Sequence, residues 1–312
     1  MRSSREMLSW RALTASDMQA VAGLASECLS FDGGQPYAAD PGYLARWYSS
    51  DTQTRAGWVG RELVCVSALR VAAGAGRDGK GSNAVTTGLV RPGWRRSGIG
   101  GHAFDWAVRK AGNGALGAET ETLNEGAHVL YLSNGLSQVF AEDVMQLAER
   151  ASLPATRAPE ALVLSHWGQA DPGRYYRVYQ ASFRDRPRFP GWTQERWIEW
   201  ISDDEDFRPE WTLLASIDGH DVGFIVADTS AWIAQMGVVP SARGKDIGAA
   251  LITAAVKQLR SAGPATITLN VNVDNPHAIA LYRRLGFIRT GGRARYEGPI
   301  IATRPTASGL ES

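Results

Sequence analysis

The run MGVVPSARGKDIG at residues 236–248 decides the fold of this 312-residue chain, because a second version of it, GLVRPGWRRSGIG, lies at residues 88–100. Five identities lie at a constant separation of 148 residues (238 − 90): Val90, Pro92, Arg95, Ile99 and Gly100 match Val238, Pro240, Arg243, Ile247 and Gly248. Four more follow at a separation of 151 residues (275 − 124): Asn124, Ala127, Tyr131 and Gly135 match Asn275, Ala278, Tyr282 and Gly286. Two blocks that recur in the same order predict two copies of one fold of about 150 residues each.

Hydrophobic periodicity and turn residues predict the same order of elements in each copy. In the second copy we expect strands at 212–217, 221–227, 232–239 and 266–273, a helix from Ile247 to about residue 263, and a helix that begins after Asn275 and ends at Gly286. In the first copy we expect strands at 62–71, 84–90 and 120–123, a helix at 99–110 and a short helix through Tyr131. Each copy is expected to open with helices, near 16–29 and near 174–183.

This order of elements predicts an α/β fold that occurs twice, each copy being a mixed, mostly antiparallel sheet flanked by helices. We expect an N-terminal domain at residues 1–151, a linker with Pro and Ala at 152–160, and a C-terminal domain at 161–312.

Composition excludes several classes of protein. Hydrophobic residues make up 44% of the chain and charged residues 21%, which is typical of globular proteins. The 33 basic residues nearly balance 32 acidic ones, so we expect no nucleic-acid partner and no membrane partner. The chain shows no signal peptide and no apolar run of about 18 residues, and its two cysteines and five scattered histidines suggest neither a disulfide framework nor a metal site. We therefore expect a cytoplasmic protein without a metal.

The repeated run is typical of an anion site. A strand leads into a turn that contains glycine, and a helix begins at once, so several backbone N–H groups and the positive end of the helix dipole face one point. Arg95 or Arg243 would add a full positive charge there. By itself, the pattern also fits a plain connection between a strand and a helix that only requires glycine. It has neither the GxxxxGK[ST] spacing of a P-loop nor the GxGxxG spacing of a dinucleotide fold.

The two blocks together resemble a known family. Arg95-x-x-Gly98-x-Gly100 followed by Asn124-x-x-Ala127-x-x-x-Tyr131 resembles the acetyl-CoA-binding motifs of the GCN5-related N-acetyltransferase (GNAT) superfamily. The second copy is closer still, because NPHAIALYRRLGF at residues 275–287 is similar to the second motif of that family almost residue for residue. Two such domains in one chain look like the tandem acetyltransferases of the mycothiol synthase type.

The resemblance implies roles for particular residues. The pantetheine arm would lie along Met236, Gly237 and Val238, or along Gly88, Leu89 and Val90. The pyrophosphate would be bound by Arg243, Gly244, Lys245, Asp246, Ile247 and Gly248, or by Arg95, Arg96, Ser97, Gly98, Ile99 and Gly100. Asn275 and Asn124 would contact the cofactor near the thioester, and Tyr282 would be the catalytic residue beside the sulfur, with Tyr131 as its counterpart.

Several of these residues also fit ordinary structural roles. Tyr282 lies on an apolar helical face, where aromatic residues usually belong to the core. Asn275 is a good N-cap. The acidic run Asp203 to Asp206 usually reads as a solvated turn, although it could also face an amine.

Two positions depart from the family pattern. Asp246 stands where glycine is expected and where the first copy has Gly98; aspartate tolerates a left-handed backbone, but its charge could repel a pyrophosphate. On this basis we expect the first copy to bind the cofactor at least as well as the second. The resemblance also implies a glutamate as general base, but Trp232 and Ala84 occupy its place in the two copies. The base could instead be a water chain, another carboxylate or a backbone carbonyl, or the acceptor amine could have a low pKa.

These observations together predict an acyl-CoA-dependent N-acyltransferase, with acetyl-CoA as the expected cosubstrate and a small-molecule amine as the acceptor. The amine would attack the thioester directly, the N–H of Val238 would stabilise the oxyanion, and Tyr282 would protonate the leaving thiolate. We expect the chemistry in the second copy, and a monomer or homodimer. The alternatives are a non-catalytic CoA-binding scaffold or acyl-CoA sensor, and an acetyltransferase that modifies peptides or proteins.

Overall fold

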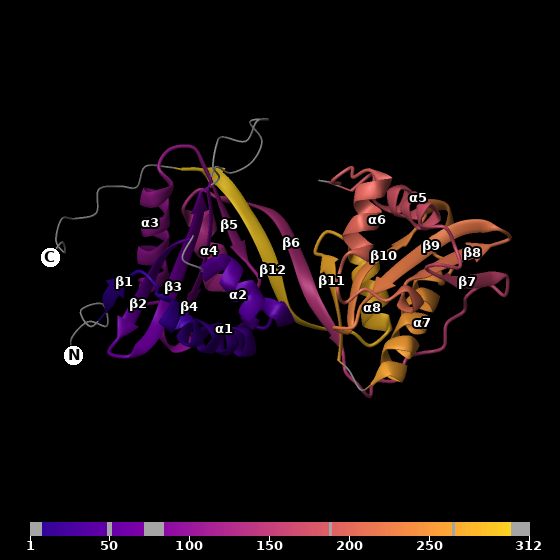
Figure 1. Cartoon of the computed structure of the whole chain (residues 1–312), viewed down its shortest axis with the longest axis horizontal. Coiled ribbons are helices and arrows are strands. Elements are labelled where there is room, and N and C mark those ends of the chain that lie inside the picture. Colours follow the sequence, from indigo (N-terminus) through magenta and orange to yellow (C-terminus); the bar gives the residue numbers. More distant parts are fainter. Residues whose placement is uncertain (1–7, 49–51, 72–83, 187–188, 264–265, 301–312) are drawn as a thin grey trace. The chain divides into compact units, whose positions relative to one another are not determined.

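The computed structural model describes residues 8–48, 52–71, 84–186, 189–263 and 266–300. The chain forms two compact units (Figure 1). Unit 1 comprises Met1–Val144 together with Thr290–Ser312, and unit 2 comprises Met145–Arg289. Each unit contains one copy of the repeated run within an α/β fold, as the sequence predicts.

Unit 1 is built on a mixed sheet in the order β1-β2-β3-β4-β5-β12-β6, in which β4 and β5 are parallel. Its elements are β1 (Ser9–Arg11), α1 (Met18–Asp32), α2 (Pro41–Tyr48), β2 (Gln53–Val59), β3 (Glu62–Val71), β4 (Ala84–Val90), α3 (Ile99–Ala111), β5 (Ala115–Thr120), α4 (Glu125–Ser133), β6 (Ser137–Leu147) and β12 (Ile288–Pro299). Short 3-10 turns precede α1 and α2, and another, Pro92–Trp94, follows β4. The last residues of β6 and the first two of β12 belong to unit 2.

Unit 2 repeats this plan with a sheet in the order β7-β8-β9-β10-β11, in which only β10 and β11 are parallel. Its elements are β7 (Leu162–His166), α5 (Pro172–Phe183), α6 (Gln194–Ser202), β8 (Leu213–Ile217), β9 (His220–Ala227), β10 (Trp232–Val238), α7 (Ile247–Ala262), β11 (Ile267–Asn272) and α8 (Pro276–Arg284). Short 3-10 turns, Pro209–Trp211 and Pro240–Ala242, precede β8 and follow β10.

Helices cover both faces of the unit 2 sheet, with α5 and α6 on one side and α7 and α8 on the other (Figure 1). The period of two along the strands explains this arrangement. Leu213 and Ala215 are buried with α7 and α8, whereas Leu214 between them is buried with α5 and α6. Strands that are apolar on both faces require a helical layer on each face.

Two details differ from the sequence-based expectation. The strand expected at 120–123 lies at Ala115–Thr120, because residues 115–119 include Ala and Gly and none of the β-branched residues that mark a strand. The expected C-terminal domain 161–312 also loses its last strand to unit 1. Antiparallel pairing of β12 with β5, in which Tyr296 lies opposite Ala118, ties residues 294–299 to unit 1, and neither β12 nor β6 was predicted.

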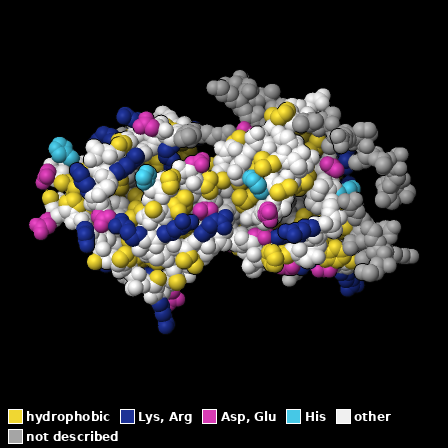
Figure 2. All heavy atoms as spheres, turned by 180° about the vertical axis from the view of Figure 1, so that it is seen from behind, with side chains coloured by type: hydrophobic (Ala, Val, Ile, Leu, Met, Phe, Trp, Pro, Cys, Tyr) yellow, Lys and Arg dark blue, Asp and Glu magenta, His cyan; other side chains and the backbone are white. Residues whose placement is uncertain are grey.

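The described residues contain no helix long and apolar enough to cross a membrane, and no group of three or more His, Cys, Asp or Glu residues that could hold a metal. On the face shown in Figure 2, basic and acidic side chains are interspersed, which agrees with a net charge of +1.

Close backbone approach in unit 1 gives a testable stability difference between two glycines. A Cβ atom on Gly291 of β12 would lie 2.0 Å from the Gly34 nitrogen, whereas a Cβ on Gly23 of α1 meets nothing within 4 Å. We expect Gly291→Ala to destabilise the protein by about 1–3 kcal/mol, visible as a lower midpoint of thermal unfolding. The control Gly23→Ala should be neutral or stabilising by up to about 1 kcal/mol. Equal midpoints for both variants would contradict this packing.

Candidate functional site

The turn after β10 and the turn after β4 have the same backbone shape. Each contains two residues with a left-handed backbone, Gly244 (φ 77°) and Asp246 (φ 58°) in unit 2, and Arg96 (φ 61°) and Gly98 (φ 80°) in unit 1. Glycine therefore occupies the first of these two positions in unit 2 and the second in unit 1. The expectation that Asp246 can adopt the backbone of the missing glycine is confirmed.

The helix that follows each turn presents N–H groups toward it. The first intrahelical hydrogen bond of α7 runs from the Ala250 N–H to the Asp246 carbonyl (3.0 Å), and that of α3 runs from His102 to Gly98 (3.1 Å). The N–H groups of residues 247–249 and 99–101 come before this bond and have no intrahelical acceptor. Both turns thus have the backbone of an anion site.

The strand before each turn separates from its parallel neighbour. The ladder between β10 and β11 has two pairs, the last being Ile233 with Leu269, and that between β4 and β5 has three. Val239 donates its N–H to Val222 of β9 (3.0 Å), so alternation turns the N–H groups of Val238 and Met236 toward the side from which β11 has departed. An extended chain could pair there as an additional strand.

The same alternation holds in unit 1. Arg91 donates its N–H to Val64 of β3 (2.8 Å), so the N–H groups of Val90 and Gly88 face the side from which β5 has departed. The structure thus brings the residues expected to hold a pantetheine arm next to the predicted anion turn in each unit.

A β-bulge distinguishes the two units. Between β10 and β9 the register shifts at Ile233 and Gln235, which leaves Ala234 as an extra residue, whereas β3 and β4 pair without interruption from Cys65 to Val71. The extra residue reverses the alternation of β10. Gln235 therefore faces α6, where its Oε1 accepts a hydrogen bond from Trp197 Nε1 (3.2 Å).

The expected phosphate ligands Arg95 and Arg243 each make hydrogen bonds within their own unit. Arg243 donates from Nε to the carbonyl of Val238 (3.2 Å) and from a terminal nitrogen to the carbonyl of Ser182 at the end of α5 (3.2 Å). Arg95 makes the equivalent Nε bond, to the Val90 carbonyl (2.9 Å). Each arginine therefore joins the end of its strand to the first long helix of its unit.

In unit 1 this arginine is neutralised. Its two terminal nitrogens lie 2.6 and 2.7 Å from the carboxylate of Asp32, whose side chain is only 4% exposed. Asn124 Nδ2 donates to the same carboxylate (3.3 Å). A buried acid that the linear motif does not contain therefore binds two of the residues predicted to bind the cofactor.

In unit 2 the acid of the turn is neutralised instead. Asp246 Oδ1 lies 2.7 Å from a terminal nitrogen of Arg284 on α8, and its Oδ2 accepts the Arg157 N–H (3.2 Å). The bond from Arg284 holds the pKa of Asp246 below its ordinary value. Arg243 and Lys245 have no ion pair with another described residue within unit 2, so this turn keeps its positive charge. The pairing of Asp246 with Arg284 weakens the charge argument for ranking the first copy at least equal to the second, and the relative affinities of the two copies stay a prediction.

Both motif asparagines are N-caps. Asn124 Oδ1 accepts the Ala127 N–H (3.0 Å), and Asn275 Oδ1 accepts the Ala278 N–H (3.2 Å). The ordinary structural role of Asn275 is thus confirmed, and its contact with a cofactor stays a prediction.

Tyr131 and Tyr282 occupy equivalent buried positions, each 6% exposed. The ring of Tyr282 lies 6.0 Å from that of Phe287, whereas Tyr131 lies between Phe104 (5.6 Å) and Tyr296 (4.9 Å). Burial raises the pKa of Tyr131 well above that of an ordinary tyrosine. The two phenols therefore differ in their aromatic surroundings.

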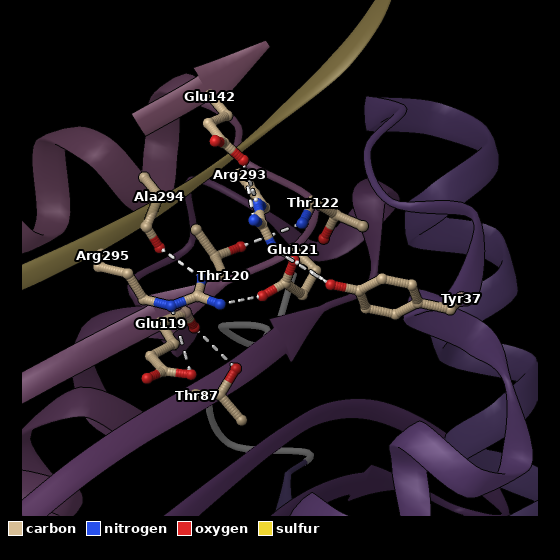
Figure 3. A network of polar contacts seen from close by, with 10 residues as sticks. All are labelled: Tyr37, Thr87, Glu119, Thr120, Glu121, Thr122, Glu142, Arg293, Ala294 and Arg295. Carbon is tan, nitrogen blue, oxygen red and sulfur yellow. Dashed lines mark hydrogen bonds and ion pairs between the residues drawn. The ribbon is translucent and has the colours of Figure 1, made fainter. Parts of the chain in front are cut away.

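Polar side chains occupy the place where β4 and β5 separate in unit 1 (Figure 3). Thr87 donates across the separation to the Glu119 carbonyl (2.8 Å). Glu121, whose side chain is 4% exposed, accepts hydrogen bonds from Arg295 and from the Tyr37 hydroxyl (3.1 Å), and lies 3.5 Å from Arg293. Unit 1 thus bridges this separation with its own side chains.

The cavity that remains beside this network in unit 1 is lined in part by Tyr43, Tyr48, Thr87, Gly88, Thr120 and Glu121. Sequence reasoning missed Glu121 and Asp32. Their partners are 63 to 174 residues away along the chain, so no local pattern could have identified them.

Trp232 takes the place where the family resemblance implies a base. Its backbone N–H donates to Asp228 Oδ1 (3.2 Å), which also accepts from the backbone N–H (3.0 Å) and the hydroxyl (2.6 Å) of Ser230. Burial raises the pKa of Asp228 above its ordinary value. This carboxylate holds the tight turn between β9 and β10.

Comparisons with known proteins agree with this geometry. The model of the acetyltransferase (GNAT) family matches residues 174–287, which lie within unit 2. A mycothiol acetyltransferase of Paenarthrobacter aurescens is 30% identical over 224 residues, covering 68% of this chain and 68% of that protein.

Two solved structures share the fold across nearly the whole chain. A GCN5-related N-acetyltransferase from Sphaerobacter thermophilus has a TM-score of 0.70 at 22% identity and covers 95% of this chain and 96% of its own. A tandem GNAT protein from the clavulanic acid biosynthesis pathway has a TM-score of 0.59 at 18% identity and covers 95% of this chain and 100% of its own.

The difference in charge between the two turns can be tested with one exposed cation in each. Lys245→Ala removes a positive charge from the unit 2 turn, and Arg96→Ala, the control, removes one from the unit 1 turn. We expect Lys245→Ala to weaken acetyl-CoA binding about fivefold at low salt, since one partly screened charge contributes on the order of 1 kcal/mol. Arg96→Ala should leave the affinity within about twofold in titration calorimetry. The reverse result would place the binding turn in unit 1.

Proposed function

Because the chain belongs to the GNAT family of N-acetyltransferases, we propose that it transfers an acetyl group from acetyl-CoA to the amine of a small molecule, and that unit 2 carries the reaction. This proposal rests on three features that follow one another in unit 2. They are the N–H groups of β10 that face away from β9, the positively charged turn after β10, and the N-terminus of α7. These groups fit an extended amide-containing arm that ends in a pyrophosphate.

The residues of unit 2 have separate tasks in this proposal. Met236 and Val238 would hold the pantetheine arm through their backbone, and the turn from Arg243 to Gly248 would hold the pyrophosphate. The N–H of Val238 would stabilise the oxyanion that forms when the amine nitrogen attacks the thioester carbon. When the C–S bond breaks, Tyr282 would donate its proton to the thiolate. The attacking nitrogen would release its proton to solvent, and the Tyr282 phenolate would take up a proton from solvent.

The residue at position 232 constrains the acceptor. Tryptophan cannot remove a proton, so we propose an acceptor amine of low pKa, such as an α-amine with a pKa near 7.7–8.0. A large fraction of such an amine is already neutral at neutral pH. The similarity to a mycothiol acetyltransferase indicates which acceptor to test first. This acceptor is desacetylmycothiol, the amine that such an enzyme would acetylate.

Unit 1 fits the second function considered from the sequence, a domain without catalysis. The specific observations are the ion pair of Arg95 with the buried Asp32 and the bridge from Thr87 across the separated strands. We propose that unit 1 serves as a scaffold and that the chain binds one equivalent of acetyl-CoA, with micromolar or tighter affinity.

Calorimetry and a transfer assay test the proposal directly. Titration with acetyl-CoA should show one binding event per chain, and incubation with acetyl-CoA and desacetylmycothiol should release CoA thiol and form an amide. Two equal binding events would remove the distinction between the units. No heat and no thermal shift with acetyl-CoA would remove the proposed function.

A matched pair of tyrosine variants tests the assigned proton donor. Tyr282→Phe keeps the buried ring and removes only its hydroxyl, so we expect turnover to fall roughly ten- to a thousandfold with acetyl-CoA affinity nearly unchanged. Tyr131→Phe in unit 1 is the control and should leave turnover within about twofold. If Tyr131→Phe lost turnover and Tyr282→Phe kept it, the reaction would belong to unit 1.

A further inference from the structure

Neutral amide side chains face α5 and α6 at the place where β10 and β11 separate. Ile233, in the last paired position of β10, packs with α7 and α8. The bulge residue Ala234 follows it, and Gln235 then faces the opposite side, where Trp197 of α6 donates to its Oε1. The carbonyl oxygen of Gln235 therefore has a partner.

Asn270 is the residue of β11 that immediately follows the last ladder pair. Its neighbours Leu269 and Val271 both pack in the core with α7 and α8, so the period of two places the Asn270 side chain on the face toward α5 and α6. Its Oδ1 is buried and has no hydrogen-bond partner among the residues that the structure describes. A buried carbonyl oxygen without a donor is costly to the folded protein, so ordered water or a ligand is expected to supply one.

In unit 1 the side chain at the equivalent position has a partner from the protein itself. Glu119 takes the place of Asn270 there (270 − 151), and its carboxylate lies 3.5 Å from Arg295 of β12. Thr87, the counterpart of Gln235 (235 − 148), donates to the backbone carbonyl of Glu119 (Figure 3). Unit 1 thus supplies a charged partner, Arg295, for the side chain at this position, whereas the described residues supply no donor for Asn270 Oδ1 in unit 2.

A second buried polar atom lies on the same face of unit 2. Ser182 Oγ of α5 has no hydrogen-bond partner among the described residues, and it lies 2.9 Å from where a Cβ on Gly237 would be. Two buried polar atoms without a hydrogen-bond partner among the described residues therefore flank the part of β10 whose N–H groups face away from β9. Both can accept a hydrogen bond, which is what an amine or hydroxyl needs.

We propose that Asn270 positions the acceptor in unit 2, its Oδ1 accepting a hydrogen bond from the N–H of the amine that attacks the thioester. This inference rests on the proposed function. The bond directs the nitrogen toward the separated strands and selects acceptors with an N–H donor, while Asn270 itself removes no proton. No covalent step passes through this side chain.

Three variants test this role, with desacetylmycothiol as the probe. Asn270→Leu keeps the approximate size and removes the oxygen, so we expect the KM for desacetylmycothiol to rise roughly ten- to a hundredfold while the KM for acetyl-CoA stays within about twofold. Asn270→Asp restores an oxygen that accepts a hydrogen bond and should return the KM for desacetylmycothiol to within about threefold of wild type. Thr268→Val is the control: Thr268 lies two residues earlier on the same face, and its hydroxyl accepts a hydrogen bond from Gln146 Nε2 (3.3 Å), so this variant should leave both KM values unchanged.

The outcomes separate this inference from the proposed function. Transfer by the wild type with an unchanged KM for desacetylmycothiol in Asn270→Leu would overturn the role of Asn270 and leave the proposed function standing. An equal rise in both KM values, or a similar rise in Thr268→Val, would show a structural effect and also overturn it. If the wild type neither transfers acetyl to desacetylmycothiol nor binds it in calorimetry when loaded with CoA, both the acceptor and the role of Asn270 fall.

Discussion

The separation of two parallel strands after two ladder pairs is the constraint on which the rest of unit 2 depends. Once β11 leaves β10 after Leu269, the N–H groups of Met236 and Val238 no longer face a neighbouring strand. Backbone polar groups require partners, so this edge can accept an extended chain that carries carbonyl groups. The same strand leads directly into the turn and the N-terminus of α7, which places an anion site at the end of that edge.

Unit 1 shares the turn and the separation of the parallel strands with unit 2 but surrounds them with different side chains, which shows what this backbone geometry alone does not decide. Its strands also separate, after Thr86 and Ala118, but Thr87 bridges them and Asp32 neutralises the arginine of the turn. In our proposal the repeat thus yields one unit that binds and one that supports. The difference arises from a few polar contacts rather than from a change of fold.

The charge of the two turns illustrates why sequence reasoning could predict the fold but not the charge that each turn carries in the folded protein. Counting charges within each turn favours unit 1, because it contains two arginines and no acid. Asp32 and Arg284 reverse this result, since the first cancels Arg95 and the second cancels Asp246. Both lie far from the turns along the chain. Electrostatic interactions depend on distance in space, which the linear order does not contain.

The sequence by itself determined the two copies, the order of most strands and helices, the two turns, and the equivalence of Tyr131 in the first copy to Tyr282 in the second. These features follow from local periodicity, from residues that tolerate a left-handed backbone, and from repetition at a fixed separation. Only the tertiary structure decided that β12 joins the sheet of unit 1, that Arg95 is neutralised, and that the Asn270 side-chain oxygen is buried without a donor among the described residues. These outcomes depend on which distant segments meet, because strand pairing, burial and ion pairs form between residues that the chain brings together only when it folds.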